Sequence, residues 1–389
     1  MEYTSLERVK AALEHKEADR VPFDLGGSAV TGINKKSLTR LRNYLGLPEK
    51  ETRICSIISQ LGFVDDDLAD RLKVDVRAVD PKPSAKKGLE KEIWLDNEYY
   101  KLIDKFGIGW KMPVNHGHYF DAYYHPLENF ETEAEVNDYP WPDPQDTSIY
   151  QSMREEAAMI TEQEKRAYVL GRYCSGMWET ALWMAGYEKF LCDMMLNENF
   201  VHAVMTKFTE LKMRYWERAL KEAGESALVI SEADDLATQK SLLISLDLYK
   251  KMIWPYHKQL FEFIKKKAKS KVYIFFHNDG ACAPTIPLLI EAGVDILNPV
   301  QVNCPGMDTK GLKREFGKDI TFWGALCDSQ FVLPFGTPDQ VREETKRRVD
   351  DLMKDGGWIA APIHNIQSDV PPENIMAMWE TLRENGVYR

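Results

Sequence analysis

The sequence predicts an α/β protein with a (β/α)8-barrel (TIM-barrel) fold. First, short apolar runs alternate with helix-length segments, giving about eight strand–helix units, the number that a closed parallel barrel needs. Second, a length of 389 residues suits one large barrel, and 44% hydrophobic residues are enough for a full core. The chain has no tandem repeat and no low-complexity tract. We therefore expect a single barrel domain over residues 1–389.

The elements can be placed in order from these runs. A first helix is expected over residues 5–16, because its apolar residues recur at helical spacing and Thr4 or Ser5 can cap it. Eight strands should follow it, at residues 21–24, 74–79, 168–170, 227–230, 272–276, 294–297, 320–323 and 358–361. A doubly wound open sheet could use the same units. It would favour a glycine-rich phosphate-binding turn after the first strand, and Gly26-Gly27 followed by Gly32 matches that spacing poorly.

An insertion separates the second and third predicted strands, at about residues 81–145. Its aromatic residues, such as Trp94 and Trp110, alternate with polar residues on either side of Asn97. That alternation predicts antiparallel β-ribbons. We expect these ribbons to form a lid beside the barrel.

The composition argues against several classes of protein. A formal net charge of −11 argues against sequence-independent nucleic-acid binding, which depends on a basic surface. The sequence has no apolar run long enough to cross a bilayer and no secretion signal at its start. Its six cysteines form no CxxC pair, which is typical of reduced thiols. We expect a cytoplasmic protein with no nucleic-acid or membrane partner.

Polar residues that could carry chemistry follow the predicted strands. In a parallel barrel the active site lies at the carboxyl ends of the strands. The residues at these ends are Asp24, Asp80, Arg172, Tyr173, Cys174, Glu232, Asp234, Asp235, His277, Asp279, Asn298, Gln301, Cys327, Asp328, His364 and Gln367. From this set we expect Glu232 and Asp235 to be catalytic. Substrate-binding residues are expected to be Asp24, Tyr173, Gln301 and Asp328, with His118 of the insertion. Each one could equally be a helix cap or a structural hydrogen-bond partner.

A metal site is the sharpest prediction. His277 and Asp279 are two apart, so in an extended segment both side chains face the same side and can reach one ion. His364 leaves another predicted strand at the same rim. Two histidines and a carboxylate with an open position suit a catalytic zinc site. The alternative is that both histidines are neutral and hydrogen-bonded to nearby carboxylates. The HxH pair at His116 and His118 lies in the insertion, where a lid is the favoured interpretation.

Several motifs, in the same order over most of the chain, resemble the uroporphyrinogen decarboxylase superfamily. They are Glu7-Arg8-Val9, Asp19-Arg20-Val21-Pro22, Asp234-Asp235-Leu236-Ala237-Thr238-Gln239, Asn298-Pro299-Val300-Gln301 and Pro371-Pro372-Glu373-Asn374-Ile375. True decarboxylases of that superfamily have an arginine-rich segment just after the RVP stretch, which binds the substrate carboxylates. Here residues 23–28 contain no arginine. This difference counts against decarboxylation of a polycarboxylate.

Within the superfamily, the chain resembles the corrinoid-dependent methyltransferase branch, which includes the methylcobamide:coenzyme M methyltransferases. That branch binds zinc through a His-x-Cys motif and a distant cysteine. His277, Asp279 and His364 occupy the matching positions. The resemblance therefore implies a metal site in which both sulfur ligands are replaced. Fewer thiolates leave more positive charge on the ion, which makes it a better Lewis acid toward oxygen.

These features predict a methyltransferase. It would move a methyl group from an O-methylated small molecule, such as an aromatic methyl ether, to a corrinoid carried by a partner protein. Zinc or another divalent ion would act as the Lewis acid. Three alternatives remain open. They are a decarboxylase acting on a different substrate, with Asp24 or Asp80 as the key carboxylate, a methylcobamide:thiol methyltransferase, and a barrel that has lost catalysis and only binds a corrinoid protein or a small molecule.

Overall fold

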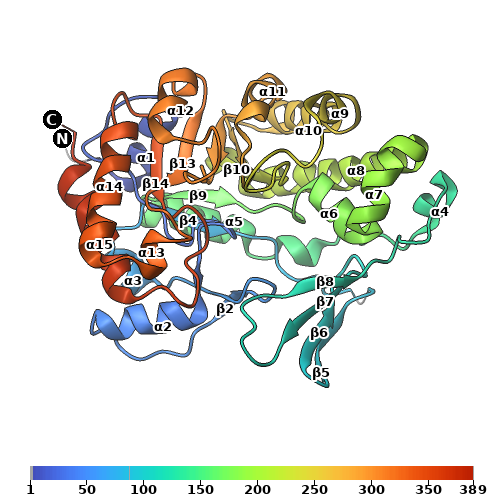
Figure 1. The fold of residues 1–389 in the computed structure, drawn as a ribbon, viewed down its shortest axis with the longest axis horizontal. Coiled ribbons are helices and arrows are strands. Elements are labelled where there is room, and N and C mark those ends of the chain that lie inside the picture. Colours follow the sequence, from blue (N-terminus) through green and yellow to red (C-terminus); the bar gives the residue numbers. More distant parts are fainter. Residues whose placement is uncertain (1–2, 87, 389) are drawn as a thin grey trace.

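The computed structural model describes residues 3–86 and 88–388 and contains a parallel barrel (Figure 1). Seven parallel strands are hydrogen-bonded in the order β14-β13-β12-β11-β10-β9-β4. They are β4 Val76–Val79, β9 Ala167–Leu170, β10 Val229–Ala233, β11 Tyr273–His277, β12 Ile296–Asn298, β13 Thr321–Ala325 and β14 Trp358–Ala361. Each one overlaps a strand predicted from the sequence, so the barrel prediction is confirmed.

Residues 21–24 occupy the eighth position and close the ring between β14 and β4. Phe23 forms a parallel bridge to Ala360, and the Asp24 N–H donates to the Ala360 carbonyl at 2.9 Å. On the other side, the Asp75 N–H donates to the Phe23 carbonyl at 2.8 Å. Pro22 has no N–H to give, so the pairing is too irregular for a full strand.

Helix α1 (Ser5–Leu13) closes the amino end of the barrel. Thr4 caps it, and the Thr4 hydroxyl accepts a hydrogen bond from the Glu7 N–H at 3.2 Å. Val9 and Leu13 pack into the same buried cluster as Phe275 of the barrel interior. The apolar face predicted for this helix therefore forms the floor of the barrel.

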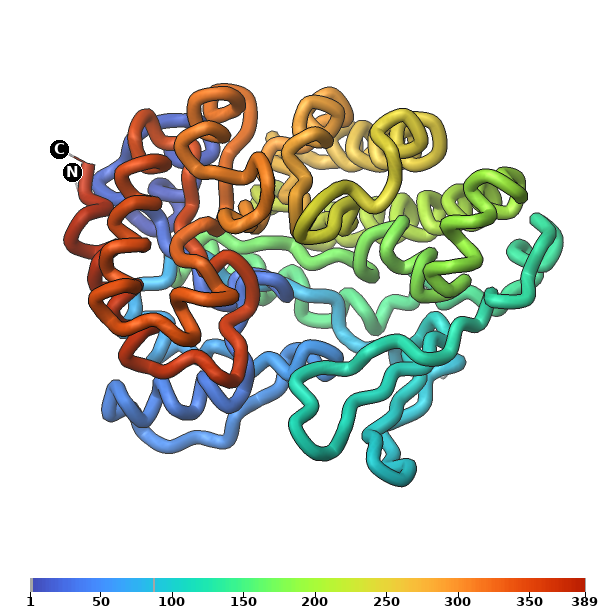
Figure 2. Tube along the Cα trace, viewed as in Figure 1, coloured from blue at the N-terminus to red at the C-terminus, as the bar shows by residue number. Residues whose placement is uncertain are grey.

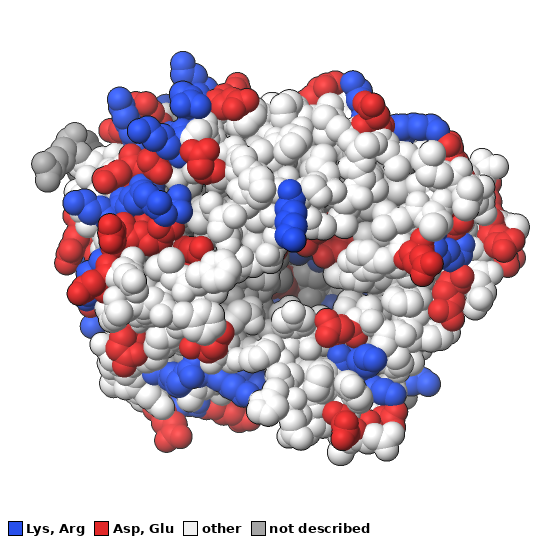
Figure 3. Space-filling model, in the orientation of Figure 1, with Lys and Arg blue, Asp and Glu red and all other residues white. Residues whose placement is uncertain are grey.

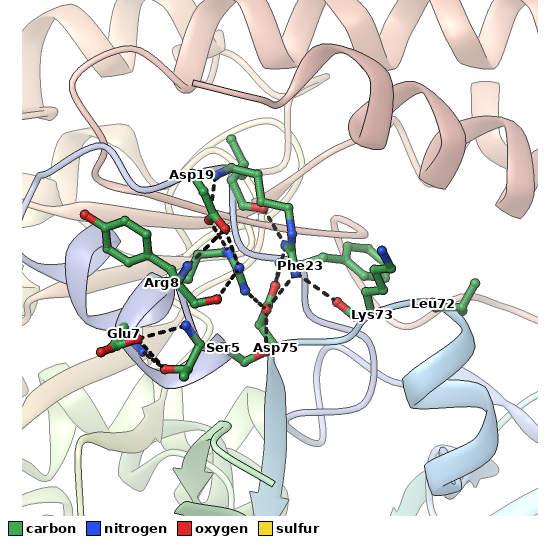
Figure 4. Close-up of polar contacts among 12 residues, drawn as sticks. Ser5, Glu7, Arg8, Asp19, Phe23, Leu72, Lys73 and Asp75 are labelled. Atoms are coloured by element: carbon green, nitrogen blue, oxygen red, sulfur yellow. Dashed lines mark hydrogen bonds and ion pairs between the residues drawn. The ribbon is translucent and has the colours of Figure 1, made fainter. Parts of the chain in front are cut away.

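Four charged residues stabilise the same end of the barrel (Figure 4). Arg8 reaches Asp19 through Nε and Asp75 through Nη1, both at 2.7 Å. Arg20 Nη1 lies 2.7 Å from the other oxygen of Asp75, which also accepts the Phe23 N–H at 2.8 Å. Asp75 thus joins α1, the closing segment and the start of β4.

The remaining helices form the outer layer (Figure 1). They are α2 Lys35–Tyr44, α3 Asp66–Arg71, α4 Glu133–Asp138, α5 Met153–Ala158, α6 Met177–Ala185, α7 Tyr187–Leu196, α8 Glu198–Ala223, α9 Leu246–Met252, α10 Trp254–Lys267, α11 Ile286–Ala292, α12 Thr309–Phe316, α13 Val332–Phe335, α14 Pro338–Leu352 and α15 Pro372–Asn385. Helix α10 packs between α8 and α11, and α14 packs between α12 and α15. The two ends of the chain lie on the same side of the molecule (Figure 2). Among the described residues, no helix is both long and apolar enough to span a bilayer.

The insertion between β4 and β9 forms a separate antiparallel sheet with the order β5-β6-β7-β8. Its strands are β5 Lys91–Asp96, β6 Tyr99–Ile103, β7 Gly109–Pro113 and β8 Asp121–Tyr124. Asn97 lies in the turn between β5 and β6 with φ 54°, a left-handed conformation that asparagine tolerates. The predicted β-ribbon is therefore present, and it lies beside the barrel (Figure 1). A small third sheet pairs β1 (Ile33–Asn34), β3 (Leu61–Gly62) and β2 (Ile54–Ser56).

Candidate active site and metal-binding residues

A cavity of about 640 Å³ opens at the carboxyl ends of the barrel strands. Its walls come from the loops after β9, β10, β11, β12, β13 and β14 and from the β8 edge of the insertion. Figure 3 shows a hollow on this face, bordered mostly by uncharged atoms. The side chains that line the cavity include Trp110, Phe120, Arg172, Ser175, Glu179, Trp183, Asp235, His277, Asp279, Gln301 and His364.

His277 is the last residue of β11, and its ring orientation is fixed by a neighbouring amide. Its Nδ1 lies 2.6 Å from Asn298 Oδ1. Asn298 Nδ2 donates to the Trp323 carbonyl at 2.8 Å, so the amide oxygen must face the histidine. Nδ1 therefore carries the proton, and the lone pair of Nε2 is left for a ligand.

Asp279 and His364 bring two more potential ligands to this nitrogen. Asp279 Oδ2 lies 3.6 Å from His277 Nε2 and 3.7 Å from His364 Nε2. One ligand atom from each of the three residues lies within 4.8 Å of the others, and this is the one such group within residues 3–86 and 88–388. These separations are too long for direct hydrogen bonds. They are the separations expected of ligands around a shared ion, and two imidazoles with one carboxylate suit zinc. The group therefore fits a divalent metal.

The protonation states also favour metal binding. Burial lowers the pKa of His277 to about 4, against the opposing charge of Asp279. Burial and the positive charge of Arg172 lower the pKa of His364 to about 4. Both imidazoles are therefore neutral near pH 7, the form that binds a metal. Burial raises the pKa of Asp279 to about 7, a cost that a bound cation would offset.

Two further carboxyl groups line the cavity. Asp235 Oδ1 accepts the Asp279 N–H at 2.8 Å and so holds the loop after β11 in place. The Glu179 carboxyl accepts a hydrogen bond from the Ser175 hydroxyl. Burial and the nearby charge of Asp235 raise the pKa of Glu179 to about 8. Glu179 is therefore largely protonated at neutral pH, and it can donate a proton inside the cavity.

Glu179 is held there by the start of α6. Asp234 accepts the Trp178 N–H at 3.1 Å and the Glu179 N–H at 2.7 Å, which is favourable at a helix N-terminus. The Asp234 oxygen that accepts the Trp178 N–H also lies 2.6 Å from His257 Nε2. Asp234 therefore positions helix α6.

Glu232, which the sequence predicted to be catalytic, does not line the cavity. Strand β10 runs to Ala233, beyond the end predicted from the sequence, and Glu232 is still part of it. Side chains alternate along a strand, so Ser231 faces the barrel interior and Glu232 faces α8. There the carboxylate pairs with Lys212 Nζ at 2.7 Å and accepts the Trp216 Nε1–H at 2.6 Å.

The predicted substrate-binding residues are divided between the cavity and other places. Gln301 lines the cavity, and its Oε1 accepts the Gly280 N–H at 2.9 Å. Asp24 is fully buried beneath it and accepts the Trp323 Nε1–H at 2.9 Å. Asp328 accepts the backbone N–H groups of residues 330 and 331. These two carboxylates therefore serve the barrel and its loops.

The last two lie outside the cavity wall as well. Tyr173 stacks on Tyr215, with ring centroids 5.3 Å apart, and borders a different cavity of about 760 Å³. His118 Nδ1 lies 2.9 Å from the Ser368 hydroxyl on the outer rim. That contact joins the insertion to the loop after β14.

Glu179 and Ser175 were not predicted, because they follow no strand directly. Glu179 lies in the first turn of α6, and Ser175 lies in the loop after β9, just before that helix. A signal was present in the sequence, since a glutamate in the first turn of a helix that follows a barrel strand lies near the strand ends. Arg172 was recognised at a strand end and was given no role.

Sequence comparison assigns the family. The family described as uroporphyrinogen decarboxylase (URO-D) matches residues 104–385, well over half of the chain. The chain belongs to this family. No curated protein matches the sequence.

Among solved structures, a methyltransferase from Methanosarcina mazei matches the family fold over 98% of this chain and 99% of its own, with 20% identity and a TM-score of 0.62. That likeness supports the barrel. Two xylanases match less well. One is a GH10 endoxylanase from a sugarcane soil metagenome, with 10% identity over 61% of this chain and 85% of its own, and a TM-score of 0.36. The other is xylanase 10B from Thermotoga maritima, with 8% identity over 60% and 79%, and a TM-score of 0.38.

Proposed function

We propose that this member of the uroporphyrinogen decarboxylase family is a cytoplasmic methyltransferase that transfers a methyl group from an O-methylated small molecule to a corrinoid on a partner protein. The observation that carries the proposal is the group formed by His277, Asp279 and His364 in the cavity at the carboxyl end of the barrel. Among the described residues, no cysteine lines this cavity. The Methanosarcina mazei protein with the similar fold is a methyltransferase, which adds support.

The donor atoms of the site favour chemistry at oxygen. His277 Nε2, His364 Nε2 and Asp279 Oδ2 would hold a zinc ion or another divalent ion. Such an ion, when bound, supplies Lewis acidity toward the ether oxygen. A site with no thiolate leaves more positive charge on the ion than one with two, which suits an oxygen leaving group better than activation of a thiol.

The proposed reaction breaks one bond to the methyl group and forms another. The O–CH3 bond breaks, and its electron pair stays on the oxygen. The methyl group passes to reduced cobalt(I), which provides the electron pair of the new bond. The oxygen takes up one proton, and Glu179, which is half-buried, lines the cavity and is hydrogen-bonded to Ser175, can donate it. Asp235 keeps Asp279 in position through the hydrogen bond to its backbone.

Decarboxylation of a polycarboxylate has less support. Among the described residues, Arg172 is the only arginine or lysine that lines the cavity. Several carboxylates on one substrate would need several cationic partners. Asp24, the carboxylate considered for that reaction, is bonded to Trp323 below the cavity. We therefore expect no release of carbon dioxide from uroporphyrinogen.

The ligand set can be tested by changing its charge. Wild type, loaded with zinc and given a reduced corrinoid protein, should methylate the cobalt from 3-methoxybenzoate and should transfer methyl poorly from methylcobalamin to coenzyme M. The double variant Asp279→Cys/His364→Cys should keep its metal and lose ether cleavage by at least about tenfold, because two thiolates weaken the Lewis acid.

Rates must be compared per bound metal, and Asp339→Asn on the exposed first turn of α14, outside the cavity, is the control with wild-type activity. Undiminished ether cleavage by a metal-replete double variant would show that ligand charge does not select the reaction. Efficient methylation of coenzyme M by wild type would contradict the proposed preference of the metal site for oxygen over thiols.

A further inference from the structure

Arg172 places one positive charge at the wall of the cavity. It lies two residues beyond β9, is half-buried, and lines the cavity together with the proposed metal ligands. Its Nη1 donates to the Ser231 hydroxyl at 3.0 Å. Ser231 lies on the inward face of β10, so this bond anchors the guanidinium toward the barrel interior. The side chain is therefore held in place by the barrel.

No carboxylate neutralises this charge directly. The acidic residues at the cavity face its histidines instead, with Asp235 and Asp279 near His277 and Asp279 near His364. None of the ion pairs found within residues 3–86 and 88–388 involves Arg172. A guanidinium has five N–H donors, and the bond to Ser231 uses one. A half-buried arginine with open donors is suited to receive an anion.

The aromatic cavity wall beside β8 indicates what the rest of such a ligand would be. Trp110, Phe120 and Trp183 line the same cavity. The Trp110 and Trp183 rings pack edge to face, with centroids 5.1 Å apart, and form one rigid aromatic surface. A flat ring fits against such a surface, and a cavity of about 640 Å³ is large enough for a small ring-bearing ligand.

We propose that Arg172 binds a single carboxylate on the ring of the methyl donor and thereby fixes which part of the ring faces His277, Asp279 and His364. This inference rests on the proposed function for the identity of the ligand as a methyl donor. One guanidinium matches one carboxylate, and a planar fork recognises that group through two parallel hydrogen bonds. The substrate class is therefore an aromatic methyl ether with one ring carboxylate.

The test uses 3-methoxybenzoate and 3-methoxybenzamide, which have nearly the same shape and differ in charge. Their affinities for the zinc-loaded full chain are measured by calorimetry, with no corrinoid protein present. Wild type should bind the acid at least about tenfold more tightly than the amide, since a charge-assisted pair replaces a neutral one. Arg172→Gln should remove this preference, and Arg172→Lys should retain part of it, since the charge remains and the fork is lost.

Arg214→Gln is the matched control, because Arg214 is an exposed arginine that lies 3.4 Å from Asp143, outside this cavity. It should keep the wild-type preference. Equal binding of acid and amide by wild type, binding of neither, or an unchanged preference in Arg172→Gln would each overturn the inference. If Arg172→Gln loses metal or unfolds, the comparison of Arg172→Lys with wild type decides.

The two proposals fail separately. Charge-dependent binding without methyl transfer would reject the reaction and retain the anion site. Methyl transfer with equal use of the acid and the amide would retain the reaction and reject the role of Arg172.

Discussion

The two ends of the barrel hold charged side chains in opposite states. At the amino end, Arg8, Asp19, Arg20 and Asp75 are paired with one another at 2.7 Å. Asp75 is fully buried, and both of its oxygens accept hydrogen bonds from arginines. The cost of removing these charges from water is therefore offset within the protein itself.

At the carboxyl end, comparable groups face one another without direct bonds. Asp279 lies 3.6 Å from His277 and 3.7 Å from His364, and Arg172 has no ion pair among the described residues. The same kinds of residue therefore serve the fold at one end and are available to ligands at the other. Burial alone therefore does not identify a functional charge, whereas the lack of a direct partner at the cavity points to one.

This difference also divides the motifs that carry the family resemblance. Arg8 and Arg20 belong to the two motifs near the start of the sequence, and both act on Asp75. Asn298 belongs to a later motif, and it orients His277. A motif shared with a family thus contains residues that close the barrel as well as residues that support the site.

The largest effect is expected at the paired end. Asp75→Asn would leave Arg8 and Arg20 without their buried carboxylate, and loss of one partner of a buried pair costs about 3–5 kcal/mol. Chemical denaturation should show a fall of that size in the free energy of unfolding. The exposed Asp339, paired with Arg342 at 3.0 Å, gives the control, and Asp339→Asn should change stability by less than about 1 kcal/mol. Equal losses in the two variants would contradict the structural role of the amino end.

The second effect is expected in metal affinity. His277→Ala should abolish stoichiometric zinc binding, because it removes a ligand, and His118→Ala should leave binding intact. Asn298→Ala keeps every ligand and frees the ring of His277, so zinc affinity should fall by about 10–100-fold. Metal analysis after dialysis and competition with a chelator measure both. Full occupancy in His277→Ala would remove this residue from the metal site.

Much of the fold could be predicted because strand signals are local. Each of the eight apolar runs lies on a barrel strand or on the closing segment, and the turn at Asn97 matches the predicted ribbon. The ion pairs of Asp75 could not be predicted, because Arg8 and Asp75 are far apart in the sequence. Only the closed barrel brings them together.

The residues of the site could be predicted only where the ends of the strands could be predicted. His277 and Asp279 are close in sequence, and His364 follows another strand, so the parallel barrel places all three at one rim. Glu232 was expected just after a strand because the predicted strand ended at residue 230, whereas β10 continues to Ala233 and directs the Glu232 side chain toward α8. The position of Glu179 depends on where α6 begins. The hydrogen bond from the Glu179 N–H to Asp234 holds that end of the helix.

A third effect concerns how stability changes with pH at the carboxyl end. The pKa of Glu179 is raised by burial and by Asp235 to about 8, above its ordinary 4.5. The folded protein therefore binds this proton more tightly than the unfolded chain does. The stability it contributes is fully present below about pH 4.5 and is lost as the pH rises through about 8.

Glu179→Gln should make the fall in unfolding free energy between pH 5 and 8 shallower, by at most about 1.4 kcal/mol per pH unit, the effect of one proton. Urea unfolding of metal-free protein at several pH values measures it. Asp235 and Asp279 have raised pKa values of about 6 and 7, so part of the fall should remain in the variant. The exposed variant Glu343→Gln should follow the wild-type curve, and the same curve for Glu179→Gln would show that this carboxyl is not held protonated in the cavity.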